Sequence, residues 1–235
     1  MSCRYAVYFA PDPASPWWAR GCAWLGRDAL GGAAVVQPRI EGVDAASFAR
    51  ITAAPRRYGW HATLKPPFRL AAGADERMLR ARLAALAARL RAVALGRLEA
   101  DSLGRFVALV APKDAALEAL AARCVVELDD LRAPPGEDEL TRRAAAVRDA
   151  RERELLASYG YRYVLDRFRL HFSLTGALDH SDTPHAASVL AAARRRFDPL
   201  NEAAPLRLDR LSLFVEPGPG APLARVADFP LSGAA

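Results

Sequence analysis

The stretch RRYGWHATLKPPF, residues 56–68, and its later counterpart RLHFSLTG, residues 169–176, decide the predicted fold. The first has the composition of a strand that Pro66 and Pro67 end, because proline cannot donate to a sheet ladder. The second closes a longer predicted strand over residues 161–176. Each contains a histidine, a hydroxyl residue two positions later and then a leucine, as HATL and HFSL. One short pattern therefore occurs twice, each time on a predicted strand.

Each of these strands is followed by a predicted helix and then by another strand. Apolar residues recur at helical spacing over residues 75–95 and 184–197, and strands are predicted over 104–112 and 206–216. The remaining predicted elements are strands over 4–10 and 224–229 and helices near 17–25, 113–131 and 138–157. This approximate internal repeat predicts an α+β fold of two lobes that face one another.

Length and composition agree with an ordered globular protein. The chain has 235 residues, of which 52% are hydrophobic and 26% charged. We expect residues 1–235 to form a single bilobal domain, one lobe centred on residues 61–65 and the other on residues 171–175. The oligomeric state is left open by the sequence.

Charge and cysteine content narrow the function classes only slightly. A net charge of +6 favours anionic ligands without choosing among a small phosphate ester, RNA and a merely soluble surface. No apolar run approaches the roughly 18 residues of a membrane span, and the first residues do not resemble a secretion signal, so a cytoplasmic location without membrane contact is expected. Three cysteines without C-x-x-C spacing suggest neither a disulfide framework nor a zinc ribbon.

The two histidines are predicted to share a polar strand face with their hydroxyl partners. Serine and threonine supply only 15 of the 235 residues, so two H-x-[ST] matches among four histidines are unlike a chance result. Alternation along a strand separates the apolar residues Phe168, Leu170, Phe172 and Leu174 from the polar residues Arg169, His171, Ser173 and Thr175. It likewise places His61, Thr63 and Lys65 together.

Such a face is suited to phosphoester chemistry. Breaking a P–O bond requires one proton to be removed and another to be donated, and imidazole can perform either task near neutral pH. A hydroxyl two positions along the strand can donate a hydrogen bond to a phosphate oxygen. Because this scheme needs no metal, and the sequence lacks H-E-x-x-H and acidic clusters beside His61 and His171, neither a metal nor another cofactor is expected.

Both motifs and their contexts, together with the opening RYAVYFAP, resemble the 2H phosphoesterase superfamily over nearly the full chain, in the branch encoded with bacterial phosphonate-degradation genes. The resemblance implies a bilobal, pseudo-twofold α+β fold in which two antiparallel-rich sheets flank a central cleft and helices lie outside. It implies a metal-independent hydrolase of a cyclic phosphodiester or related phosphoester, with a place in phosphonate metabolism as one interpretation. It implies His61 and His171 as acid and base, in an order left open, and Thr63 and Ser173 as phosphate ligands. The alternative is an RNA- or nucleotide-binding protein, or an RNA cyclic phosphodiesterase of the RNA 2′,5′-ligase type.

Further residues are candidates for substrate binding beside these motifs. Lys65 shares the predicted polar face with His61, although simple solvent exposure explains it equally well. The other candidates, on or beside predicted strands, are Arg169, Thr175, Tyr5, Tyr58 and Arg105. His180 and His185 lack a hydroxyl residue two positions later and are interpreted as ordinary surface histidines. The expected ligand is a small phosphorylated molecule such as a cyclic phosphate, nucleotide or ribose phosphate, with RNA left open.

Overall fold

The computed structural model describes residues 3–180 and 182–233 and confirms the α+β class. Seven strands form one antiparallel sheet in the order β4-β5-β6-β2-β1-β8-β9, and β3 pairs with β7 in a separate two-stranded sheet. The strands are β1 Arg4–Phe9, β2 Ala62–Phe68, β3 Val93–Ala94, β4 Glu99–Leu103, β5 Phe106–Val110, β6 His171–Ser173, β7 Arg207–Leu208, β8 Arg210–Glu216 and β9 Ala224–Pro230.

Helices surround the sheet, and several begin at an aspartate that caps them. The α-helices are α1 Pro16–Leu25, α2 Ala45–Ile51, α3 Ala53–Tyr58, α4 Glu76–Ala87, α5 Ala115–Val126, α6 Glu137–Ala144, α7 Ala150–Tyr159, α8 Thr183–Phe197 and α9 Leu200–Ala203. Short 3₁₀ turns, η1 Asp129–Leu131 and η2 Leu165–Arg167, precede irregular segments. Asp44, Asp75, Asp114 and Asp149 accept hydrogen bonds from main-chain N–H groups at the starts of α2, α4, α5 and α7.

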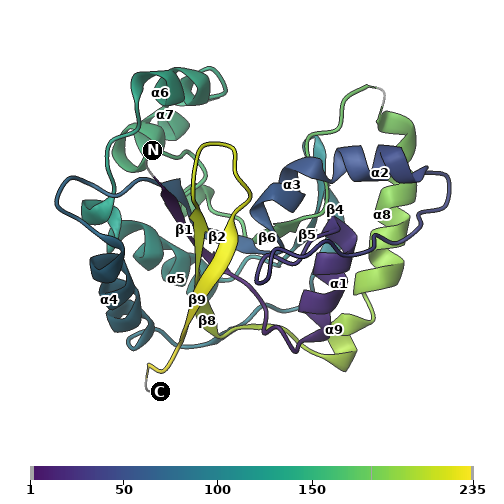
Figure 1. Ribbon diagram of the computed structural model, residues 1–235, viewed down its shortest axis with the longest axis horizontal. Helices are drawn as coiled ribbons and strands as arrows, with labels where there is room; N and C mark the ends of the chain where they lie inside the picture. Colours follow the sequence, from purple (N-terminus) through teal and green to yellow (C-terminus); the bar gives the residue numbers. More distant parts are fainter. Residues whose placement is uncertain (1–2, 181, 234–235) are drawn as a thin grey trace.

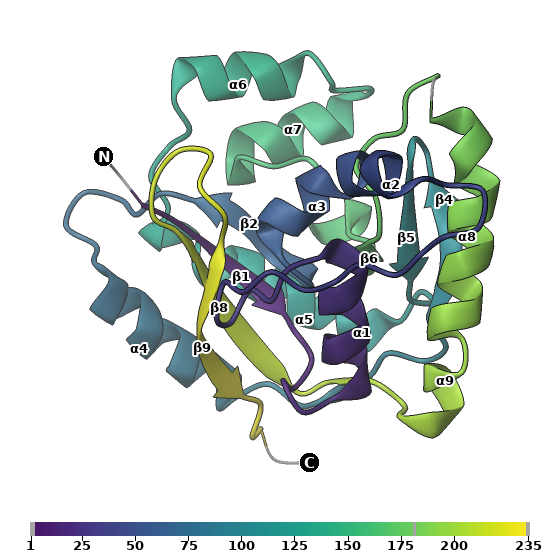
Figure 2. The same ribbon diagram turned by 45° about the vertical axis from the view of Figure 1, so that its right-hand side comes forward.

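The two motif strands are neighbours in one sheet. β2 pairs directly with β6, and the helices α1 and α8 lie toward the β4–β6 end while α4 packs against β8 and β9 (Figures 1 and 2). The expectation of two sheets that flank a cleft is therefore wrong in its strand pairing. Sequence periodicity identifies strands but carries no information on which strands pair.

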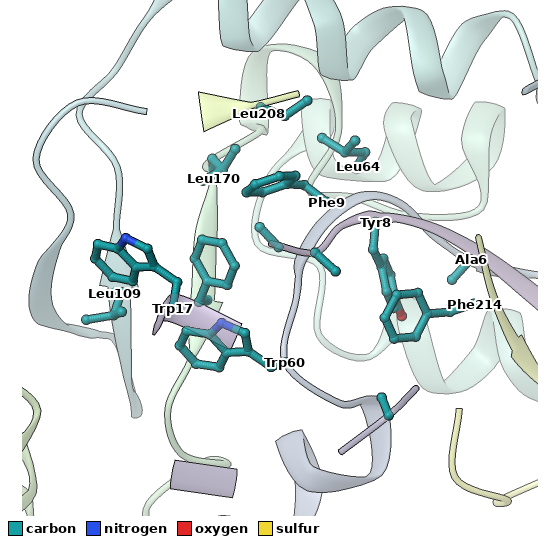
Figure 3. Packing of buried hydrophobic residues seen from close by; sticks show 14 of the residues in the cluster. Ala6, Tyr8, Phe9, Trp17, Trp60, Leu64, Leu109, Leu170, Leu208 and Phe214 are labelled. Carbon is teal, nitrogen blue, oxygen red and sulfur yellow. The ribbon is translucent and has the colours of Figure 1, made fainter. Parts of the chain in front are cut away.

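Large aromatic side chains fill the core beside the motif strands. Phe172 of β6 stacks on Trp60 with ring centroids 4.9 Å apart, and Trp60 stacks in turn on Phe197 of α8 at 5.4 Å. Phe9 contacts the edge of Phe172 from β1, and all four residues are 0% exposed. Figure 3 shows this packing around Trp60 and Phe9. The apolar face predicted for the second motif strand is thus anchored in the core.

Several predicted boundaries changed. The strand predicted over 161–176 contains only the three residues of β6, since η2 interrupts the stretch before it. β2 runs through Pro66 and Pro67 rather than ending at them. The pairing with β1 shifts register there, so these prolines, which have no N–H group, need not donate a hydrogen bond to β1. No element is predicted between residues 25 and 56, yet α2 and the first half of α3 lie there.

None of the helices in the described part of the chain is both long enough and apolar enough to cross a membrane.

Candidate functional site

The antiparallel pairing of β2 with β6 brings the two H-x-[ST] motifs together. Ala62 is the partner of Phe172, so one step outward His61 lies opposite Ser173 and Thr63 lies opposite His171. Side chains directly opposite have Cβ atoms about 5 Å apart, and the diagonal pair His61 and His171 is about 7–8 Å apart at the backbone. Each histidine therefore has a hydroxyl of the other motif beside it. This crossed arrangement places four groups suited to a phosphate, those of His61, Thr63, His171 and Ser173, on one face of the sheet, the histidine face.

The two imidazoles are held in the same way. Nδ1 of His61 lies 2.8 Å from the Gly59 carbonyl oxygen, and Nδ1 of His171 lies 2.8 Å from the Arg169 carbonyl oxygen. A carbonyl oxygen only accepts, so each Nδ1 carries the proton and each Nε2 presents a lone pair as an acceptor. The Thr63 hydroxyl lies 3.3 Å from Nε2 of His61. Both rings can thus accept a proton through Nε2.

Burial keeps both imidazoles neutral. Desolvation lowers the pKa of His61 to about 4, although the hydrogen bond to Gly59 opposes it, and the nearby His171 lowers that pKa further. Desolvation also lowers the pKa of His171, and the guanidinium of Arg169 acts in the same direction. In the unliganded protein both histidines are therefore uncharged at pH 7. A bound phosphate would reverse part of this effect, because a negative charge favours the imidazolium form.

A stacked tyrosine supports His61. The ring of Tyr8 in β1 lies 3.7 Å from that of His61, centroid to centroid, with the planes inclined by 19°. Phe214 of β8 also packs against Tyr8, with ring centroids 4.9 Å apart, and its ring lies 6.0 Å from that of His61. Tyr8 is the register partner of Thr63, so it lies on the same face of the sheet. The sequence prediction missed Tyr8, since alternation alone did not say which face of β1 meets the histidines.

Gly59 and Glu216 fix the path of the backbone that leads from α3 into His61. Gly59 ends α3 with φ +81° and ψ 178°, a conformation nearly restricted to glycine, and its carbonyl binds the His61 ring. Glu216, buried at the end of β8, accepts hydrogen bonds from Arg4 and Arg57 and ties β1 and α3 to β8. Tyr58, a predicted candidate, lies next to this network, with its ring 6.4 Å from that of His61. It stays a candidate at the border of the histidine face.

The surroundings of His171 are more open. The ring of Phe106 lies 5.6 Å from the His171 ring, and Phe106 also lines an open hollow of about 550 Å³. The predicted residue Arg105 lines the same hollow and donates from Nε to the Leu178 carbonyl at 3.2 Å. Arg169 is exposed and close enough to influence the pKa of His171. Arg105 and Arg169 thus remain candidates on the His171 side.

Lys65 is directed away from the histidines. Tyr8 pairs with Thr63 but Val7 pairs with Lys65, so β2 contains an extra residue at Leu64. This bulge turns Lys65 to the face opposite Thr63. There its ammonium binds the Val125 carbonyl at 2.9 Å and Asp129 Oδ1 at 3.0 Å. The predicted place beside His61 is wrong, because simple alternation does not anticipate a bulge.

Tyr5 and Thr175 are likewise occupied elsewhere. Tyr5 lies three residues before Tyr8, on the other face of β1, and its hydroxyl donates to Glu76 of α4 at 3.3 Å. Thr175 lies beyond the end of β6. Its buried hydroxyl accepts from the Val107 N–H at 3.0 Å and donates to the Gly176 carbonyl at 2.9 Å. Both hydroxyls serve the fold, so neither is kept in the candidate site.

Within residues 3–180 and 182–233, no group of three or more histidine, cysteine, aspartate or glutamate side chains is placed to hold a metal ion.

Comparisons with known proteins give a family and two named relatives. A family model described as "Protein of unknown function (DUF1045)" matches residues 63–224. The chain is 40% identical over 232 residues to ribose 1,5-bisphosphate phosphokinase PhnN of Janthinobacterium sp. (strain Marseille), covering 98% of this chain and 51% of the relative. It is 44% identical over 223 residues to the protein of the same name from Laribacter hongkongensis (strain HLHK9), covering 93% and 49%. The chain thus spans about half the length of the curated relatives it matches.

These names contradict the predicted reaction. Both relatives are named as kinases of a ribose bisphosphate, not as hydrolases of a cyclic phosphodiester. The phosphoesterase function, the hydrolase class and the alternative of an RNA cyclic phosphodiesterase are therefore corrected. The error has a physical origin: two imidazoles and two hydroxyls predict a phosphate ligand, but they do not distinguish transfer of a phosphoryl group from hydrolysis.

Proposed function

Since the chain belongs to the DUF1045 family and both named relatives are ribose 1,5-bisphosphate phosphokinases, we propose that it binds ribose 1,5-bisphosphate on the histidine face and serves phosphoryl transfer. The observation that carries this proposal is the crossed pairing of His61 with Ser173 and of Thr63 with His171. It supports the proposal because hydroxyl donors and neutral imidazoles then surround one position that a phosphate group can occupy.

The proposed roles follow from the chemistry of the four groups on the histidine face. Thr63 and Ser173 donate to phosphate oxygens, and Nε2 of one imidazole accepts the remaining proton of a phosphate monoanion. Loss of that proton leaves a more nucleophilic oxygen, which attacks the terminal phosphorus of a nucleoside triphosphate donor, and the bond from that phosphorus to the bridging oxygen breaks as the nucleoside diphosphate leaves. The second imidazole, protonated in the presence of the bound anion, neutralises charge that develops during transfer.

The phosphoryl donor needs a separate site in this proposal. A G-x-x-x-x-G-K-[ST] motif for nucleotide phosphates does not occur in the 235 residues, because Leu64 and Pro112 precede the two lysines. The histidine face is therefore proposed as the ribose phosphate site. In the longer relatives, we propose that the donor binds in the half that this chain does not match.

We also propose that the two expected lobes are two halves of the seven-stranded sheet. A pseudo-twofold axis between β6 and β2 would relate the strands β4 to β6 to the strands β2, β1 and β8 and would pass between the two H-x-[ST] motifs. This arrangement, within one domain over residues 1–235, keeps the likeness to 2H proteins at the level of fold and motif. A place in phosphonate metabolism, implied by the same likeness, is retained as part of the proposal.

Calorimetric titration with ribose 1,5-bisphosphate at pH 7 tests the proposal. We expect the wild-type chain to bind it and to prefer it over ribose. The variants His61→Ala and His171→Ala are each expected to weaken binding at least tenfold, because each removes a group adjacent to the phosphate. Phosphoryl transfer from ATP with Mg²⁺, followed by ³¹P NMR, then measures whether the chain alone supplies the donor site.

His185→Ala is a matched control, since His185 lies in the first turn of α8, outside the β2–β6 pair. Its affinity should stay within twofold of the wild type. Equal binding by wild type and both motif variants, or absence of wild-type binding at millimolar ligand, would refute the ribose phosphate site.

A further inference from the structure

Tyr8 combines deep burial with a hydroxyl group that the fold does not use. The side chain is 1% exposed, and its ring contacts both His61 and Phe214, as Figure 3 shows for the contact with Phe214. Within residues 3–180 and 182–233, its hydroxyl forms no hydrogen bond. The buried side-chain atoms without a partner in this part of the chain are Trp60 Nε1, His185 Nδ1 and Arg196 Nε, so the Tyr8 hydroxyl keeps contact with solvent and a ligand can reach it.

Other buried aromatic residues show how the fold normally treats their polar ends. The Tyr5 hydroxyl donates to Glu76, and the indole N–H groups of Trp17 and Trp24 donate to main-chain carbonyls at 2.7 and 2.9 Å. Trp60 Nε1 also has no partner among the described residues, but Trp60 is enclosed in the core against Phe172. Tyr8 differs from Trp60 because it lies on the histidine face.

The register of β1 places Tyr8 with the groups proposed to hold phosphate. Tyr8 is directly opposite Thr63 and stacks on His61, so the three side chains share one face. Burial raises the pKa of Tyr8 well above its usual value, and the neighbouring Tyr58 and Tyr161 add to this effect. The hydroxyl therefore stays protonated near pH 7 and is available as a donor.

We propose that Tyr8 is a ligand-contacting residue of the histidine face: its hydroxyl donates a hydrogen bond to a phosphate oxygen of the bound ligand, and its ring holds the His61 imidazole in orientation. This inference rests on the proposed ribose phosphate site and deepens it. It assigns two separable tasks to one side chain, and Tyr8→Phe removes only the first.

The test compares Tyr8→Phe with Tyr5→Phe, because both tyrosines belong to β1 but face opposite sides of the sheet. Binding of ribose 1,5-bisphosphate and of inorganic phosphate is measured by calorimetry and ³¹P NMR. Tyr8→Phe is expected to weaken both ligands about ten- to hundredfold, the usual range for a hydrogen bond to a charged group. Tyr5→Phe is expected to stay within twofold of the wild type.

Imidazole ¹⁵N NMR separates the hydroxyl from the ring. Tyr8→Phe should leave the tautomer and pKa of His61 as in the wild type, whereas Tyr8→Leu should raise that pKa toward 6.5 by letting water reach the imidazole. The same spectra show whether each variant is folded.

Three results would overturn the inference while wild-type binding persists: unchanged affinity of Tyr8→Phe for both ligands, weakening of ribose 1,5-bisphosphate alone, or an altered His61 tautomer in Tyr8→Phe. Failure of the wild type to bind either ligand would instead refute the proposed function, so the two failures are distinguishable.

Discussion

The ammonium of Lys65 lies 3.0 Å from Asp129 Oδ1, and the lysine side chain is only 2% exposed. Arg132 binds the same aspartate at 2.8 Å. This ion pair joins β2 to η1 on the side of the sheet away from the histidines. Lys65, two residues after Thr63, thus stabilises the fold and lies outside the proposed ligand site.

Replacing the acid of this pair should destabilise the protein. Asp129→Asn leaves the Lys65 ammonium buried with weaker compensation, and we expect the free energy of unfolding to fall by about 2–3 kcal/mol. Urea denaturation measures the change. Asp130→Asn is the matched control, because its pair with Arg82 is on the surface and should contribute less than about 1 kcal/mol. Equal losses for the two variants would contradict the structural role of Lys65.

His61 should make stability depend on pH in acid. Its pKa is lowered to about 4 in the folded protein, while the unfolded chain has the usual value of about 6.5, so the unfolded state binds more protons between these values. Stability is therefore full above pH 6.5 and falls as the pH drops to 4, by about 3 kcal/mol from this group. Urea unfolding at several pH values should show a shallower fall for His61→Asn. An identical pH profile in wild type and variant would show that the His61 imidazole is not buried in its neutral form.

Gly59→Ala should disturb both stability and the histidine face. The residue has φ +81°, and an added Cβ would lie 2.5 Å from Cβ of Ala29. Strain and clash together should cost more than about 2 kcal/mol and weaken ligand binding, because the Gly59 carbonyl orients His61. Gly73→Ala has the same kind of φ, +83°, with open space around its Cβ, and isolates the strain, about 1 kcal/mol. Should both variants lose the same stability, contact with Ala29 would not be the cause.

Two threonines near the motifs should respond oppositely to substitution by valine. Thr63→Val removes a hydroxyl from the histidine face and should weaken ribose 1,5-bisphosphate binding about five- to tenfold with little loss of stability. Thr175→Val leaves the buried N–H of Val107 without its acceptor and should destabilise the protein by about 1–3 kcal/mol while binding persists. Calorimetry and urea denaturation distinguish the two. The reverse pattern would place Thr175, not Thr63, at the ligand.

Local sequence patterns correctly predicted several elements whose apolar residues pack in the core. The spacing of apolar residues predicted α8 and β8, and the aromatic run at the start of the chain predicted β1. The same patterns failed for the strand over 161–176, where η2 begins at Leu165 with φ +51°, a conformation that strand composition does not anticipate. The alternation of His171 and Ser173 against Phe172 held only within β6 itself, so the sequence argument failed at Thr175.

The sequence by itself determined that two histidines and two hydroxyl residues would lie on polar strand faces, because alternation along a strand is a local property of the backbone. Only the tertiary structure decided that β2 lies next to β6, that a bulge at Leu64 removes Lys65 from this face, and that Tyr8 rather than Tyr5 stacks on His61. Strand order and register depend on contacts between residues far apart in the chain, and these contacts are chosen by how the whole core packs.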